Sequence, residues 1–232
     1  MRLSFIIGLC LCGLLVSAQY AYPQAGFNLA VAIPIHEFAE ADSGKQAYFG
    51  LGGEFTFPIL EDSPVRFGLD FRYFWMGNRN KSVDVTDSIG FLYNLTTKVG
   101  GSMMPIHAHA RFDFMNTSDY PILPYFGGFA GIKVFKISNK LEFDHQDGEE
   151  PYIEFDHSIN VTGSYGFEVG MHVRVTDYIL IDARYERAFG GWAKYLDVSS
   201  VRIDDEGNAS YSELNTRTDV DIISLGAIFN FK

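Results

Sequence analysis

The amino-acid sequence predicts an all-β fold, an eight-stranded antiparallel β-barrel that crosses a membrane as an up-and-down meander. Polar and apolar residues alternate over segments of ten residues or more, longer than the roughly five-residue strands of soluble sheets. Phe and Tyr are abundant, at 21 and 13 residues, and many of them occupy the apolar positions of this alternation. Such a sheet must close in lipid, because every backbone N–H and C=O there needs a partner.

The N-terminal segment has the features of a secretory signal peptide. Arg2 is followed by an apolar run from 3 to 16 and then by Val16-Ser17-Ala18, the small-x-small pattern of a cleavage site. The run is shorter than the ~20 apolar residues of a membrane-spanning helix. We therefore expect a cleaved signal at 1–18 and a short periplasmic segment at 19–25.

Composition limits the possible partners. The 232 residues include 18 Lys and Arg against 29 Asp and Glu, a net charge of −11. This charge argues against a nucleic-acid partner, because a phosphate backbone is bound by basic surfaces. The aromatic content of 16% argues against a disordered chain.

Eight segments carry the alternation. In the clearest, 161–174, the odd positions are apolar or Gly and the even positions are polar or Gly. A soluble β-sandwich would also alternate, but its strands are shorter and its apolar faces are less aromatic than these. In chain order, the predicted strands are 26–35, 47–59, 65–76, 106–114, 125–137, 161–174, 178–188 and 219–231.

The connections alternate between short and long, which is typical of outer-membrane barrels with periplasmic turns and extracellular loops. The short connections are 60–64, 115–122 and 176–177, and the long ones are 36–46, 77–102, 138–157 and 189–217. Aromatic residues are expected as girdles at the inner rim (Phe27, Phe57, Phe114, Tyr125, Tyr178 and Phe229) and at the outer rim (Phe49, Trp75, Phe135 and Tyr185).

In topology and strand pattern, residues 26–231 resemble the small eight-stranded outer-membrane barrels of the OmpA/OmpX type. The closing sequence Ile228-Phe-Asn-Phe231-Lys232 is similar to the aromatic last strand that the barrel-assembly machinery reads in that family. The resemblance implies a bacterial outer-membrane location, with lipid and lipopolysaccharide around the barrel and the assembly machinery as a partner during insertion.

The polar faces of the strands would point into the lumen, which eight strands leave just wide enough for side chains to fill. Acidic and basic residues there are balanced, which favours a closed network of ion pairs; a proton or ion path is the alternative. The predicted network comprises Glu54, Arg66, Asp70, Arg72, His107, His109, Arg111, Asp113, Lys133, Glu168, His172, Arg174, Asp182, Arg184 and Glu186.

Enzymatic signatures are weak, and we expect no catalytic residue and no cofactor. His157 and Ser158 are adjacent, so they point to opposite faces of a strand and cannot form a nucleophile–base pair. His107 and His109 could share a metal ion, but the sequence fixes no third ligand. A lipid-modifying enzyme remains an alternative function.

The long loops carry excess acid. Segment 138–157 has seven acidic residues and one Lys around an Asp-Gly turn signal. Segment 189–217 likewise has an acidic turn, at 204–208, between two alternating runs. We expect strands five to eight to continue above the membrane as a protruding sheet whose edge could accept a partner. Asp144, Asp147, Glu149 and Glu150 could instead hold a Ca²⁺ ion, or a basic protein partner, and Asp87-Ser88-Ile89 resembles an O-glycosylation acceptor.

The function expected from the sequence is therefore a non-enzymatic outer-membrane barrel with a filled lumen. It would serve surface interaction or envelope integrity through its extracellular loops. A barrel subunit of a larger outer-membrane complex is the first alternative.

Overall fold

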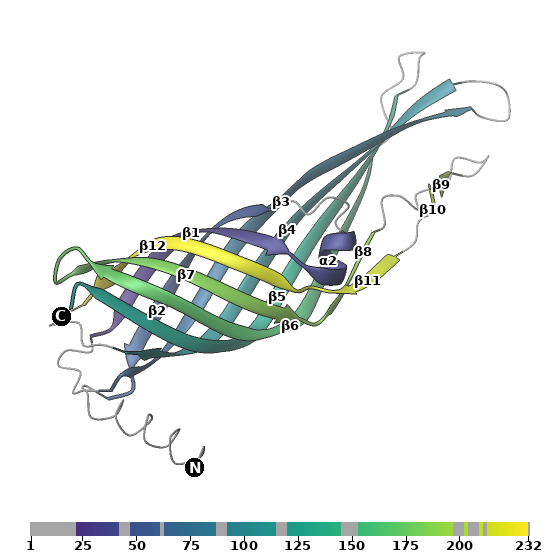
Figure 1. Cartoon of the computed structure of the whole chain (residues 1–232). Helices are drawn as coiled ribbons and strands as arrows, with labels where there is room; N and C mark the ends of the chain where they lie inside the picture. The colour runs from purple at the N-terminus through teal and green to yellow at the C-terminus, as the bar shows by residue number, and fades with distance from the viewer. Residues whose placement is uncertain are drawn as a thin grey trace, which may run out of the picture.

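The computed structural model describes residues 22–41, 47–60, 63–86, 92–114, 120–144, 153–196, 202–203, 209–210 and 213–231. Eight antiparallel strands form a closed barrel, in which each strand pairs with its neighbour in the chain and β1 pairs with β12 (Figure 1). The predicted fold is confirmed. The barrel strands are β1 (Gln24–Pro34), β2 (Tyr48–Pro58), β3 (Val65–Thr86), β4 (Leu92–Asp113), β5 (Ile122–Asp144), β6 (Ile153–Arg174), β7 (Ile179–Gly190) and β12 (Val220–Asn230).

The other described elements are short, and they follow the ends of strands. Helix α2 (His36–Ala41) follows β1, and two small sheets form from β8 (Trp192–Leu196) with β11 (Glu213–Arg217) and from β9 (Arg202–Ile203) with β10 (Ala209–Ser210). None of the helices in the described part of the chain has the length and apolar character needed to cross a membrane.

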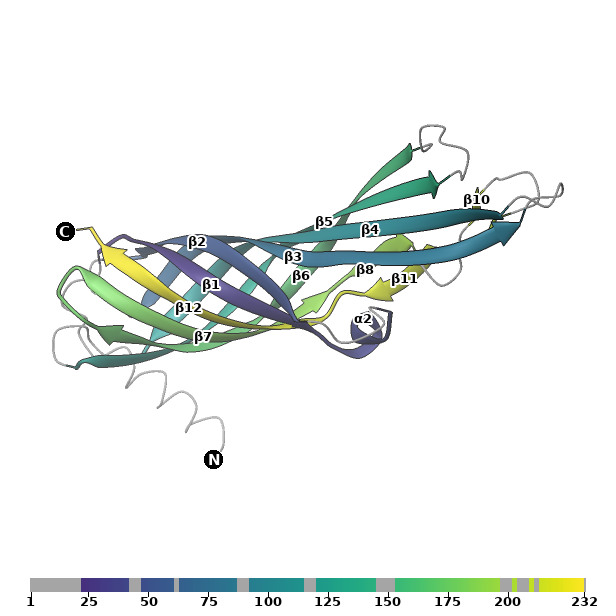
Figure 2. The ribbon, with the colours of Figure 1, turned by 90° about the horizontal axis from the view of Figure 1, so that it is seen from above.

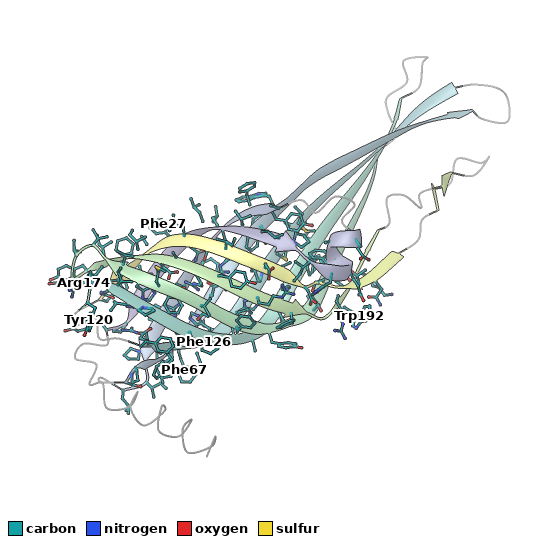
Figure 3. All side chains as sticks on the ribbon, viewed as in Figure 1. Phe27, Phe67, Tyr120, Phe126, Arg174 and Trp192 are labelled. Atoms are coloured by element: carbon teal, nitrogen blue, oxygen red, sulfur yellow. The ribbon has the colours of Figure 1, made fainter. Side chains whose placement is uncertain are left out.

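The two faces of the barrel wall differ in polarity. Large apolar side chains project outward all around the barrel, among them Leu29 at 69% exposure and Leu69 at 61%. Figure 3 shows Phe27, Phe67 and Phe126 on this outer face. An apolar exterior around a charged interior is the arrangement of a barrel surrounded by lipid. The chain is therefore an outer-membrane β-barrel.

Strands β3 to β6 are about twice as long as the other barrel strands and continue beyond the barrel (Figures 1 and 2). The last β2–β3 pair is Phe49 with Trp75, and β3 pairs only with β4 from Gly77 onward, within the described residues. Much of the predicted loops 77–102 and 138–157 is thus β-sheet. Strands at 77–102 are not predicted by apolar–polar alternation, because a sheet that is exposed to water on both faces does not require it.

The protruding strands differ from the prediction. Strands five and six do extend, as expected, but strands three and four extend with them. The seventh strand, β7, ends at Gly190, and the eighth, β12, begins at Val220. Between them, in the predicted loop 189–217, lies the separate β8–β11 sheet. The break lies at Gly191 and at Thr218–Asp219, where Thr218 N–H donates to the Gly191 carbonyl. The predicted loop 36–46 likewise begins with helix α2.

Two of the predicted girdle aromatics point inward. Tyr125 and Phe135 are almost fully buried, whereas Phe27, Phe49 and Trp75 lie on the exposed outer face as predicted. Strand β5 has its inward face at the odd positions, where small residues (Gly127, Gly131) share the lumen with these rings. A large aromatic residue near a strand end was therefore not sufficient evidence for a girdle position.

Candidate functional site

The predicted network residues lie in the lumen. Thirteen of the fifteen are buried there, contributed by six of the eight strands, β2 to β7. Asp113 and Arg174 are partly buried and lie near the periplasmic ends of β4 and β6. The buried members are Glu54, Arg66, Asp70, Arg72, His107, His109, Arg111, Lys133, Glu168, His172, Asp182, Arg184 and Glu186.

Arg184 is the centre of the network. Its guanidinium contacts the carboxylates of Glu54, Asp182 and Glu168, with 2.8 Å to Asp182 Oδ2 and 3.4 Å to Glu168 Oε2. Arg111 forms ion pairs with two of the same acids, at 3.4 Å to Glu54 and 3.5 Å to Glu168. Each of these five buried charges thus faces an opposite charge, which is the condition for tolerating ions away from water.

A second group of charges joins the first through the same arginine. Arg72 donates to Glu186 Oε2 at 2.8 Å and to Asp70 Oδ2 at 2.8 Å. Arg184 Nη1 lies 3.5 Å from Glu186 and 3.8 Å from Asp70, so a continuous network crosses the lumen.

The histidines have different partners. His109 Nδ1 lies 3.4 Å from Glu168, and His172 Nε2 lies 3.3 Å from Asp182 and 3.1 Å from Arg111. Tyr125, which the sequence assigned to the rim, donates to Asp182 at 2.7 Å beneath the Arg111 guanidinium. No group of three or more His, Cys, Asp or Glu side chains in the described residues could hold a metal ion.

His107 belongs to a different environment. Its Nε2 lies 3.0 Å from Ser164 Oγ, and its ring stacks on Phe129 at 4.6 Å between centroids. Both the imidazole and the hydroxyl are buried in the lumen. This Ser–His pair joins β4 and β6, and sequence spacing could not have found it.

The outer half of the lumen holds an apolar cluster, a feature that we did not predict. Phe74, Met103, Phe129 and Ile222 form a buried cluster there, packed with small residues of β1 and β7. Helix α2 closes this end, because Phe38 packs edge-on against Phe135 at 5.9 Å and against Tyr48 at 6.2 Å. We call this cluster with Phe38 the apolar plug.

The two residues that precede β12, Thr218 and Asp219, are contacted by the side chains of Lys133 and His36. Lys133 Nζ donates to the Thr218 carbonyl at 2.6 Å, and His36 Nδ1 lies 3.3 Å from Asp219 Oδ2. His36 has a left-handed backbone (φ 53°) where the chain turns from β1 into the helix. At the periplasmic end, Arg66 pairs with Asp113 at 2.8 Å, and Gln24 bonds Asn230 at 2.8 Å.

The loop predicted to bind a cation or a partner lies largely outside the residues that the structure describes. Asp147, Glu149, Glu150 and the candidate glycosylation residue Ser88 lie outside the described residues. Asp144 is the last residue of β5, and its side chain is not among those described.

One solved structure among the comparisons, an outer membrane protein from Thermus thermophilus, supports the fold. No protein-family model matches the sequence, and no curated protein matches it. A major outer membrane protein from Thermus thermophilus is similar in structure, with a TM-score of 0.50 and 11% identity over 90% of this chain and 99% of that one. Neisserial surface protein A gives a TM-score of 0.48 and 16% identity over 90% of this chain and 97% of that one. OprG from Pseudomonas aeruginosa gives 0.42 and 12% identity, over 93% and 98%.

Proposed function

We propose that this protein is a non-enzymatic outer-membrane barrel whose role is to present the protruding part of β3–β6 to a partner outside the cell. The observation that carries the proposal is the length of these strands. Four strands of 22 or 23 residues are paired in register well beyond the ~9–11 residues that a membrane crossing requires.

The protruding sheet has two edges without a neighbouring strand in the described residues. On β3 this edge is Gly77–Thr86, and on β6 it covers residues 153–162, before Gly163 accepts the Gly191 N–H and pairing with β7 begins. An open edge offers a row of backbone donors and acceptors to an added strand. We therefore infer recognition by strand addition.

The filled lumen supports a role on the surface rather than in transport. The ion-pair network fills the middle of the barrel and the apolar plug fills its outer half. The partner that fits best is basic, because segment 138–157 at the tip of β5 and β6 carries seven acidic residues and one Lys.

Shortening the β3–β4 hairpin tests this proposal. Arg79 pairs with Val99, so replacing 80–98 with an Asn-Gly turn keeps the register below the cut. Proteins that co-purify with the full chain in mild detergent should be lost with the shortened one. Backbone amides of Gly77–Thr86 should exchange with deuterium more slowly in the complex than in the barrel alone.

Shortening the β9–β10 hairpin is the matched control, since it removes surface chain but leaves both edges of the protruding sheet. Equal loss of partners in both variants, or unchanged exchange on β3, would contradict recognition by strand addition. A partner that binds both variants through the barrel wall would instead favour the alternative of a subunit in a larger complex.

A lipid-modifying activity is the second candidate, and the Ser164–His107 contact favours it. A hydroxyl 3.0 Å from an imidazole nitrogen is the geometry of a nucleophile and its base. Among the described residues, no ion pair orients His107 through a carboxylate, so the pair lacks the third member of a triad. Mass spectrometry of lipid A from cells with the native chain and with Ser164→Ala distinguishes the two functions, and identical spectra would exclude this one.

A further inference from the structure

A groove of about 480 Å³ indents the barrel wall near its outer rim, where β5, β6, β7, β8 and β11 meet. Its lining includes Tyr165 and Phe189 toward the membrane and Trp192 and Arg217 toward the outer side. This volume is within the ~300–1,000 Å³ of ordinary ligand pockets. Tyr165 and Trp192 in its lining are exposed, so the groove is open at the outer face of the wall, where Figure 3 labels Trp192, while Ser164 in the same lining is buried toward the lumen.

Gly163, which has no side chain, lies at the floor of the groove. Gly163 is exposed on the outer face of β6, and a Cβ placed there would meet no atom within 4 Å. Tyr165 and Phe189 stand beside it with ring centroids 5.6 Å apart. Apolar walls around an open glycine position fit a flexible hydrocarbon chain.

The outer end of the groove carries a cation. Arg217 is exposed, and its guanidinium lies over the Trp192 ring at 5.8 Å. Within the described residues this guanidinium makes no ion pair; Glu37 accepts the Arg217 backbone N–H at 3.2 Å instead. Asp219, which also lines the groove, is buried and bonds Gly190 N–H at 2.8 Å and His36. Arg187, next to Phe189, is already paired with Asp221 at 2.9 Å.

We propose that this groove binds one phosphorylated lipid of the outer leaflet, with an acyl chain over Gly163 and the phosphate at Arg217. The order of the groups matches the membrane, since the apolar walls lie on the bilayer side and the Arg–Trp pair lies at the interface. Charge complementarity selects an anionic lipid, and the lipid-facing opening excludes a soluble ligand.

Brominated lipids test this proposal, because bromine quenches tryptophan emission on contact. The chain has two Trp residues, so Trp75→Phe leaves Trp192 at the groove and Trp192→Phe leaves Trp75 on β3. Each protein is reconstituted in vesicles with rising fractions of dibrominated phosphatidylglycerol or dibrominated phosphatidylcholine. We expect Trp192 to select the anionic lipid about tenfold, equivalent to ~1.4 kcal/mol, and Trp75 to show no selection.

Substitutions in the Trp75→Phe background locate the site. Gly163→Leu fills the groove and Arg217→Gln removes its cation, and each should abolish the selectivity at Trp192. Gly128→Leu and Lys136→Gln are the matched controls, since both positions are exposed on β5 outside the groove lining and a Cβ at Gly128 has ordinary space. Heat-dependent gel migration verifies that each variant is folded. Equal quenching of Trp192 by both lipids, or selectivity that persists in Arg217→Gln, would overturn the proposal.

Discussion

Arg184 is the residue on which the buried charges of the lumen most depend. It contacts Glu54, Asp182 and Glu168 in one group of charges and Glu186 in the second, and so joins the two groups into one network. These acids would keep their charges without their shared counter-ion if Arg184 were removed. A buried charge without a partner is far less stable than a buried pair.

Arg184→Met should therefore destabilise the folded barrel by about 3–5 kcal/mol, measured as the shift of the urea unfolding midpoint in detergent. Lys136→Met, an exposed cation on β5, is the control and should change stability by less than about 1 kcal/mol. Similar shifts in both variants would mean that the lumen charges are solvated rather than mutually paired.

Phe167 and Ser164 lie on the same strand but on opposite faces of the wall, with Phe167 exposed to lipid and Ser164 buried in the lumen. Phe167→Arg should cost ~2–4 kcal/mol if the side chain lies near the bilayer centre, whereas Ser164→Ala should cost about 1 kcal/mol through its lost bond to His107. Unfolding in lipid vesicles measures both. A smaller penalty for Phe167→Arg than for Ser164→Ala would reverse the assigned faces.

At the scale of elements, the apolar plug depends on a helix of six residues. So short a helix is not stable by itself, and its contacts with the barrel hold it in place. Phe38 supplies the ring that inserts between Tyr48 and Phe135.

Phe38→Ala should therefore release α2 while leaving the barrel closed. We expect faster amide exchange at 36–41 and a loss of ~3 kcal/mol or more in the stability of this end, with unchanged exchange at β1 and β12. Glu40→Ala, on the exposed side of the same helix, is the control and should leave the exchange at 36–41 unchanged. Unchanged exchange after Phe38→Ala would show that the helix is held by other contacts.

The sequence predicted the strands that have one face toward lipid, because their residues alternate between apolar and polar. It did not predict the strand segments outside the membrane, which lack this alternation. Segments 65–76 and 161–174 alternate because one face meets lipid, and the structure has both as barrel strand. Residues 77–86 lie in a sheet outside the membrane, where neither face needs to be apolar. Phe74, Met103 and Phe129 all occupy inward positions of their strands, where the predicted polar lumen has no place for them.

At the scale of the whole molecule, the closed sheet predicts a characteristic resistance to detergent. A barrel has no free edge from which to unravel within the membrane, so unboiled protein should stay folded in sodium dodecyl sulfate. It should migrate differently from boiled protein and show a circular dichroism spectrum dominated by β-structure. Identical migration together with a helical spectrum would contradict the architecture.

The contact partners of the lumen residues could be predicted only in part. The sequence located Arg184, Glu54 and Asp182 on inward faces, because inward and outward positions follow from the period of two. It could not give their pairing, because Arg184 and Glu54 are 130 residues apart and meet only through the shear of the closed barrel.

The central claim is that the lumen is closed by paired charges in its middle and by the apolar plug at its outer half. Single-channel recording of the purified barrel in planar bilayers tests this claim most directly. The account predicts no stable open level of porin size, for the native protein at any applied voltage that the bilayer withstands. A reproducible conductance on the nanosiemens scale would contradict it, and would make Glu168, His172, Arg174 and Asp182 residues of a water-filled pore.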